Sequence, residues 1–160
     1  MNAPAPEIRI RRARWRDFQA VADLVAQCAA GELQAERRTI RRFRHIVHDL
    51  GNDLYLAFVE DVLAGLIHLV YVRELVAPRR AEICTILVSP IVEAGGIADS
   101  LLALACKRAQ KRDCGLIVIR SSAAPPNLSP SLAAAGFRSA GEWYKAAVPP
   151  LHAGSAKQED

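Results

Sequence analysis

A strand that runs directly into a glycine-containing loop and then a helix constrains this chain more than any other segment. Residues 81–88 have the apolar, β-branched content of a buried strand, which Ser89-Pro90 ends. The loop Glu93-Ala94-Gly95-Gly96-Ile97-Ala98 follows, and apolar residues then repeat with helical spacing to Arg112. Small residues let the backbone approach a ligand, and the free amides at a helix N-terminus attract anions. The segment therefore predicts a diphosphate site, although a tight turn that binds nothing would contain the same glycines.

The rest of the chain predicts an α/β domain around this unit. Further strands are expected at Glu7–Ala13, Leu54–Val59, Val62–Val72, Leu116–Arg120 and Trp143–Val148, and helices at Trp15–Ala30, Leu33–Asp49, Ile97–Arg112 and Ser131–Ala135. Glu60-Asp61 predicts a tight hairpin, and Gly31 the end of the first helix. The strand–helix–strand unit from Glu82 to Arg120 requires one parallel crossover in a sheet that is otherwise antiparallel.

Composition narrows the kinds of partner. The length of 160 residues suits one domain, and 51% hydrophobic residues can form a core without disulfides or metals. A formal net charge of +4 favours an anionic partner, which could be a phosphate-bearing cofactor, an acidic substrate or nucleic acid. The four cysteines form no C-x-x-C pair and no zinc spacing, so no metal is expected.

Two segments bear on localisation. Met1–Pro6 lacks the apolar stretch of a signal peptide. The longest apolar run, Val62–Val72, is too short to cross a bilayer. The sequence therefore predicts a cytoplasmic protein with no membrane partner.

The loop and its flanks resemble the acetyl-CoA loop of the GNAT acyltransferase superfamily. In that family a strand ends in V-x-P, the pattern Q/R-x-x-G-x-G/A follows, and the next helix carries paired leucines. Val88–Ala98 followed by Leu101-Leu102 has this arrangement. Ala64-Gly65 at a hairpin strand and Gly136-Phe137 after the last short helix extend the resemblance. It covers residues 7–148 and implies a mixed, mostly antiparallel sheet with one splayed parallel strand pair and helices on both faces.

The resemblance implies that acetyl-CoA binds as a co-substrate where the strands 81–89 and 116–120 part. Ile86, Leu87 and Val88 would lie along the pantetheine, and main-chain groups of Ile86 and Val88 would pair with it as an added strand does. The other residues expected to bind the cofactor are Glu93, Ala94, Gly95, Gly96, Ile97, Ala98, Asp99 and, later in the chain, Asn127. A substrate amine would attack the thioester directly, and a backbone amide near Ile86 would stabilise the oxyanion.

Glu82 is the candidate general base. It interrupts an apolar strand, and we expect its side chain on the same side as Cys84, Ile86 and Val88. The alternative is a strand-end glutamate that is exposed to solvent or paired with Arg79 or Arg80.

Two positions depart from the family pattern. Glu93 stands where the family prefers Gln or Arg, and a carboxylate there repels a diphosphate. Leu132 stands where many members have the Tyr that protonates the leaving thiolate, and Ser129, Ser131 and Tyr144 are the nearby substitutes. These departures leave open a second function, a catalytically impaired GNAT-fold protein that binds a ligand or a partner.

A group of arginines and one histidine are the other conspicuous residues. Arg37, Arg38, Arg41, Arg42 and Arg44 share one predicted helix. We expect a solvated face balanced by Glu32, Glu36 and Asp49 rather than a patch for an acidic substrate or nucleic acid. No aromatic residues alternate with the arginines, as a nucleic-acid stacking surface would require. His68 is expected to be a core residue of its strand rather than a catalytic one.

The sequence thus predicts a flexible N-terminus (1–6), a GNAT-like domain (7–148) and a disordered tail (149–160). The expected acceptor is a small-molecule or peptide amine. The strand edge near Trp143 could also pair with a second copy, so a homodimer remains open.

Overall fold

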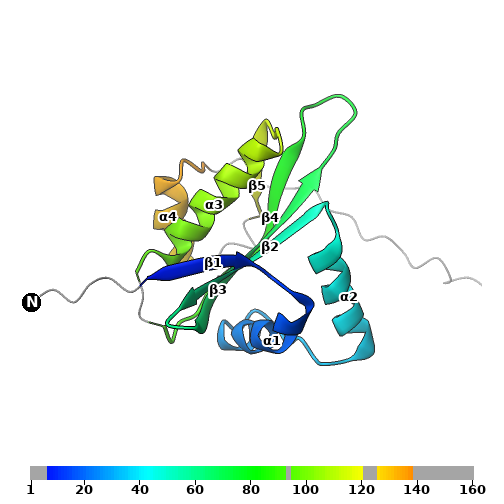
Figure 1. Ribbon diagram of the computed structural model, residues 1–160. Coiled ribbons are helices and arrows are strands. Elements are labelled where there is room, and N and C mark those ends of the chain that lie inside the picture. Colours follow the sequence, from blue (N-terminus) through cyan, green and yellow to red (C-terminus); the bar gives the residue numbers. More distant parts are fainter. Residues whose placement is uncertain (1–6, 93–94, 121–125, 139–160) are drawn as a thin grey trace, which may run out of the picture.

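The computed structural model describes residues 7–92, 95–120 and 126–138 (Figure 1). Several predictions from the sequence lie outside these residues. They are the flexible N-terminus, the tail, the strand at Trp143–Val148 with its homodimer edge, Tyr144, and the loop residues Glu93 and Ala94.

A five-stranded sheet in the order β1-β2-β3-β4-β5 forms the centre of the described structure. The strands are β1 (Ile8–Arg12), β2 (Asn52–Val59), β3 (Val62–Val72), β4 (Arg80–Val88) and β5 (Leu116–Ile119). Neighbours from β1 to β4 pair antiparallel, and β4 pairs with β5 in parallel. The predicted mixed sheet is therefore confirmed. Glu60 and Asp61, at φ 49° and 65°, make the expected tight hairpin between β2 and β3.

Helices cover both faces of the sheet, as predicted (Figure 1). One face carries η1 (Trp15–Asp17), α1 (Phe18–Gln27) and α2 (Arg37–His48), and the other carries α3 (Ile97–Lys111) with η3 (Pro126–Leu128) and α4 (Ser129–Ala134). Each face has its own apolar cluster. Leu54, Leu56, Leu66 and Leu87 pack beneath α1 and α2, whereas Ala57, Ile67, Ile83 and Ile86 pack beneath α3.

Several predicted helix bounds were wrong, among them the end of the first helix and the start of the second, and the last helix begins at Ser129 rather than at Ser131. The first helix ends at Gln27 rather than at Ala30, because Ala29 takes a left-handed φ of 50° and the Ala30 N–H donates a hydrogen bond to the Val25 carbonyl. The second helix begins at Arg37 rather than at Leu33. Leu33 reaches the apolar cluster from a non-helical segment, and Glu36 occupies the extended position before the helix.

The start of α1 depends on Asp17. Its carboxylate accepts two hydrogen bonds of 2.8 Å from the Arg11 guanidinium and one of 2.6 Å from the Arg14 N–H. The hydrogen bond from Arg11 lowers the pKa of Asp17. These contacts attach η1 to the end of β1.

We expect Asp17→Asn to lower the free energy of unfolding by about 1 kcal/mol near neutral pH. Because the folded-state pKa of Asp17 is depressed, its contribution is complete above the unfolded value of about 3.9 and is lost as pH falls through the folded value. Urea unfolding of both proteins should therefore show a difference near neutral pH that shrinks in acid. A difference of the same size in both conditions would contradict this account.

The first residue of α3 sits directly on a glycine of β3. A Cβ added to Gly65 would lie 2.8 Å from Ile97 Cγ2 and 3.0 Å from the Leu87 carbonyl oxygen. Only a residue without a side chain lets α3 begin this close to the sheet. Gly65 therefore sets the position of the helix N-terminus, where the predicted diphosphate loop ends.

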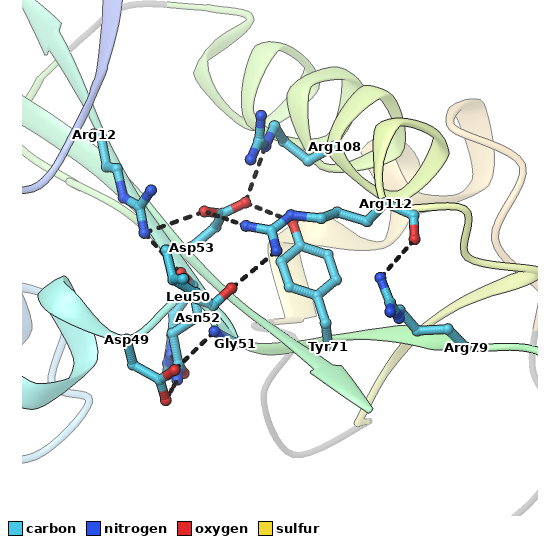
Figure 2. A network of polar contacts seen from close by, with 11 residues as sticks. Arg12, Asp49, Leu50, Gly51, Asn52, Asp53, Tyr71, Arg79, Arg108 and Arg112 are labelled. Carbon is cyan, nitrogen blue, oxygen red and sulfur yellow. Dashed lines mark hydrogen bonds and ion pairs between the residues drawn. The ribbon is translucent and has the colours of Figure 1, made fainter. Parts of the chain in front are cut away.

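Ion pairs attach the C-terminal end of α3 to the sheet. Asp53 on β2 is fully buried, and Figure 2 shows side chains converging on it from β1, β3 and α3. Arg108 Nε donates to Asp53 Oδ2 at 2.9 Å and the Tyr71 hydroxyl donates to the same oxygen at 2.6 Å. Arg12 and Arg112 lie 3.4 and 3.7 Å from Oδ1. Burial, with Asp53 adding to it, raises the pKa of Tyr71.

Candidate functional site

The described pairing of β4 with β5 ends next to a bulge in β4. Parallel pairing with β5 runs from Arg80 to Ile83, and no described strand pairs with that edge of β4 beyond it. On the β3 side, His68 is opposite Thr85 while Leu69 is opposite Ile83, which leaves Cys84 as an extra residue. A bulge bends and twists the strand that carries it. We call this edge of residues 84–88, which no described strand pairs, the open edge of β4.

Main-chain groups of Ile86 and Val88 face this open edge. The Ser89 N–H donates to the Ala64 carbonyl of the β3 side at 2.8 Å. Because consecutive residues of a strand direct their N–H and C=O groups to opposite edges, Leu87 also faces β3, whereas Ile86 and Val88 face away from it. Leu87, the third residue predicted here, instead packs beneath α1.

The N-terminus of α3 follows the open edge. Gly96 is the residue before the helix, with a left-handed φ of 84°, and no side chain caps the helix. The first helical hydrogen bond runs from the Ser100 N–H to the Gly96 carbonyl. The N–H groups of Ile97, Ala98 and Asp99 therefore have no carbonyl acceptor within the helix and are suited to binding an anion. Gly95 and Asp99 are exposed beside them.

A buried serine holds the start of the loop. The Ser89 hydroxyl donates to Gln27 Oε1 at 3.1 Å and accepts the Ile91 N–H at 3.2 Å. It is 4% exposed. The loop that leads to α3 is therefore tied to the end of α1.

The predicted orientation of Glu82 was wrong. The bulge at Cys84 reverses the alternation of β4, so Glu82 shares the α1–α2 face with Thr85 and lies opposite to Ile86. The alternative of a solvent-exposed glutamate was wrong too. Glu82 is 6% exposed, and its Oε1 accepts a 2.8 Å hydrogen bond from Arg120 Nε at the end of β5. Beside it, burial raises the pKa of the Cys84 thiol.

A cavity of about 230 Å³ opens between α1, α2 and the sheet. Its lining is mostly apolar, with residues such as Phe18, Val25, Leu33 and Ile46. The polar lining residues are Thr39 and Arg42 from α2, His68 from β3 and Thr85 from β4. The sequence did not indicate this cavity, because its walls come from segments far apart in the chain. It places His68, expected to be a core residue, at a surface that a ligand can reach.

The C-terminal part of the predicted site has little polar character. Asn127 is exposed in η3, next to the buried Leu128. Leu132 of α4 packs against the apolar cluster beneath α3, so it serves as a packing residue. Ser129 is exposed and Ser131 half-buried on the same short helix.

The arginines of α2 form an exposed face, as predicted, but acidic residues do not balance it. Among the described residues, none of Arg37, Arg38, Arg41, Arg42 and Arg44 makes an ion pair. Asp49 instead accepts hydrogen bonds from Gly51 and Asn52. The structure also adds an aromatic residue to this face, because Arg44 and Arg16 stack on Trp15 at 4.9 and 5.1 Å from the ring centroid.

Comparison with known proteins identifies the family of this chain. The sequence profile of the acetyltransferase (GNAT) family matches residues 9–129. The chain therefore belongs to the GNAT acetyltransferase family. Among curated protein sequences, none matches the chain significantly.

Solved structures share the fold. A transcriptional regulator from Bacillus halodurans C-125 superposes with a TM-score of 0.77 at 22% identity, over 89% of this chain and 100% of that one. The aminoglycoside N-acetyltransferase AAC(6')-Iy in complex with CoA gives 0.72 at 15% identity, over 92% and 99%. An acetyltransferase with acetyl-CoA from Clostridium acetobutylicum gives 0.69 at 16% identity, over 88% and 96%.

None of the helices in the described parts of the chain is both long and apolar enough to cross a membrane.

Proposed function

We propose that this protein transfers the acetyl group of acetyl-CoA to a primary amine by direct attack. The observation that supports this most is the open edge of β4 running into the uncapped N-terminus of α3. The open edge offers the main-chain groups of Ile86 and the N–H of Val88 to the pantetheine, while the Val88 carbonyl accepts a hydrogen bond from the Cys28 thiol at 3.3 Å. The amides of Ile97, Ala98 and Asp99 would hold the diphosphate, with Gly95 and Gly96 allowing close approach. Asn127 is a further proposed contact to CoA.

The cavity beneath α1 and α2 would hold the acceptor. It meets the sheet at Thr85, beside the bulge where the open edge begins. An amine placed there could attack a thioester lying along the open edge, and the Ile86 N–H would stabilise the oxyanion. The mostly apolar lining favours a small molecule or peptide end with an apolar group next to its amine.

Two side chains on this face could accept the proton of the amine. Glu82 is the sequence-based candidate, and its carboxylate is oriented by Arg120. His68 lines the cavity itself. Both lie on the α1–α2 face of neighbouring strands.

A matched pair of glycine variants tests the cofactor site. Gly96 and Gly136 have φ values of 84° and 85°, and neither has close neighbours for an added Cβ. Alanine at either position should destabilise the fold by about 1 kcal/mol through backbone strain. Only Gly96→Ala should weaken acetyl-CoA binding, by about tenfold or more, because it moves the α3 amides.

Isothermal titration with acetyl-CoA measures both variants against the unaltered chain. Failure of the unaltered chain to bind millimolar acetyl-CoA would refute the proposal. Equal weakening in the two variants would show that the effect is one of stability. Tight binding without acetyl transfer to any of a panel of amines would favour the alternative, a binding protein without catalysis.

A further inference from the structure

We propose that His68 is the general base that takes the proton from the acceptor amine, and that Asn52 and Asp49 orient its ring for this task. The inference rests on the proposed acetyl transfer and names a residue for it. It rests on three observations: the position of the ring, its hydrogen bonds and its charged surroundings.

His68 lies where the acceptor and the thioester would meet. It lines the cavity beneath α1 and α2. Across the sheet it is paired with Thr85, the residue that follows the bulge at Cys84. Of the two candidate bases, His68 is the one among the described residues that lines the cavity, because the lining omits Glu82. A proton acceptor at this position can reach the amine directly or through one water.

A chain of hydrogen bonds determines which nitrogen of the His68 ring can accept a proton. Asn52 Nδ2 donates to Asp49 Oδ2 at 2.7 Å, and Asp49 Oδ1 accepts the Gly51 N–H at 2.7 Å (Figure 2). The amide of Asn52 is thereby oriented with Oδ1 toward His68 Nε2, at 2.8 Å. An amide oxygen only accepts, so Nε2 carries the hydrogen and Nδ1 keeps its lone pair. No described residue forms a hydrogen bond with Nδ1.

The surroundings of the ring keep it neutral before the reaction. Burial lowers the pKa of His68, so the imidazole is uncharged near pH 7 and can accept a proton. The charged groups of the surrounding elements are Arg42 from α2, Glu82 on the same face of β4, and Asp49 behind Asn52. The α1 side of the cavity, represented by Phe18 and Val21, is apolar.

Glu82 is less well placed for the same role. Its Oε1 is engaged by Arg120 at 2.8 Å. This ion pair directs the carboxylate toward the end of β5, and Glu82 does not line the cavity. We therefore assign Glu82 to the orientation of β5 against β4 and assign the proton transfer to His68.

The step balances without another reactant. The amine nitrogen forms a bond to the thioester carbon while Nδ1 takes one of its protons. The tetrahedral adduct then collapses, the C–S bond breaks, and CoA leaves as a thiolate with the bonding electrons. The proton on the imidazolium passes to the thiolate or to solvent, which restores the neutral ring.

Glutamine variants of the full chain separate the two candidates. His68→Gln keeps a donor toward Asn52 and should lower kcat/KM about 10²-fold or more, while the Kd for acetyl-CoA stays unchanged. Glu82→Gln should change kcat/KM less than about tenfold. His45→Gln, on the exposed face of α2, is the control and should have no effect. Release of free CoA thiol with 2-phenylethylamine and hexylamine as acceptors gives the rates, and titration calorimetry gives the Kd. The reverse order of the His68 and Glu82 effects would overturn the proposal.

A swap of two side chains gives a readout that a structural role would not affect. Asp49→Asn with Asn52→Asp preserves the hydrogen-bond chain but places the carboxylate next to His68. A carboxylate there favours the imidazolium, so the acidic limb of the kcat/KM profile should move up by about one pH unit. An unchanged limb would contradict the role of His68 as the base.

Nuclear magnetic resonance of the ring provides a test that needs no acceptor. The ¹⁵N spectrum of the neutral protein should show the His68 Nε2–H tautomer, assigned by its loss in His68→Gln. An Nδ1–H tautomer would overturn the inference even if acetyl-CoA binds. Failure of acetyl-CoA to bind, with the Nε2–H tautomer present, would instead count against the proposed function.

Discussion

Replacing Asp53 by alanine should lower the free energy of unfolding by about 3 to 5 kcal/mol. The carboxylate is fully buried and is shared by Arg12, Arg108 and Arg112, with the Tyr71 hydroxyl as a further donor. Its removal leaves three guanidinium groups close together without their counter-charge, and it leaves the Tyr71 hydroxyl without its acceptor. Urea unfolding followed by circular dichroism measures the loss.

Asp61→Asn is the matched control for this experiment, because asparagine suits the left-handed turn position of Asp61 and removes only the charge. Asp61 pairs with Arg9 at 2.6 Å, but both side chains are exposed, at 88% and 62%. An exposed pair contributes little, so this variant should change the free energy of unfolding by less than about 1 kcal/mol. If the two variants cost the same, the cluster around Asp53 does not anchor α3. Hydrogen exchange should also accelerate in the last turns of α3 in Asp53→Ala alone.

Gly65→Ala should both destabilise the fold and weaken acetyl-CoA binding. The added methyl would lie 2.8 Å from Ile97 Cγ2 and 3.0 Å from the Leu87 carbonyl oxygen. Overpacking of this kind costs about 1 to 3 kcal/mol. Since Ile97 is the first residue of α3, relief of the contact displaces the amides proposed to bind the diphosphate. We expect the Kd for acetyl-CoA to rise about tenfold.

Gly115→Ala separates the two effects. A Cβ at Gly115 would lie 2.9 Å from Pro78 Cβ, a contact as close as the one at Gly65. Gly115 precedes β5 and lies beyond the far end of α3. This variant should lose stability while its affinity for acetyl-CoA is retained. A similar loss of affinity in both variants would show that general destabilisation, rather than the position of Ile97, controls binding.

The sequence was sufficient for the order of the helices and strands in the described residues, because local patterns determine each of them. The alternation of β3 and the helical spacing of α3 are long, and the bounds of β3 were predicted without error. The family resemblance was confirmed as well. The end of α1 and the start of α2 were harder to predict from the sequence. The first depends on a backbone turn at Ala29, and the second depends on where Leu33 packs.

Contacts between distant segments could not be read from the chain, although some residues carried a signal. Arg12 interrupts the apolar side of its strand, and Arg108 lies on the apolar stripe of its helix. Both arginines occupy these positions because they pair with the buried carboxylate of Asp53, which is far from them in sequence. The bulge at Cys84 left no such signal, because it arises from the pairing of two strands. That is why the side on which Glu82 lies was predicted wrongly.

One extra residue, Cys84, makes the difference between a regular strand and a bulged strand at β4. If Cys84 were deleted, Ile83 and Thr85 would become neighbours, with Ile83 still opposite Leu69 and Thr85 still opposite His68. All the remaining side chains of β4 would therefore keep the face of the sheet on which they now lie. Both apolar layers and the order of elements would survive the deletion. The bend that a bulge gives its strand would be lost, and a straight β4 could pair with a neighbouring strand along its whole length. A relative with this deletion would retain the architecture and lose the open edge proposed to bind acetyl-CoA, so overall similarity of fold would be a poor guide to whether that site is present.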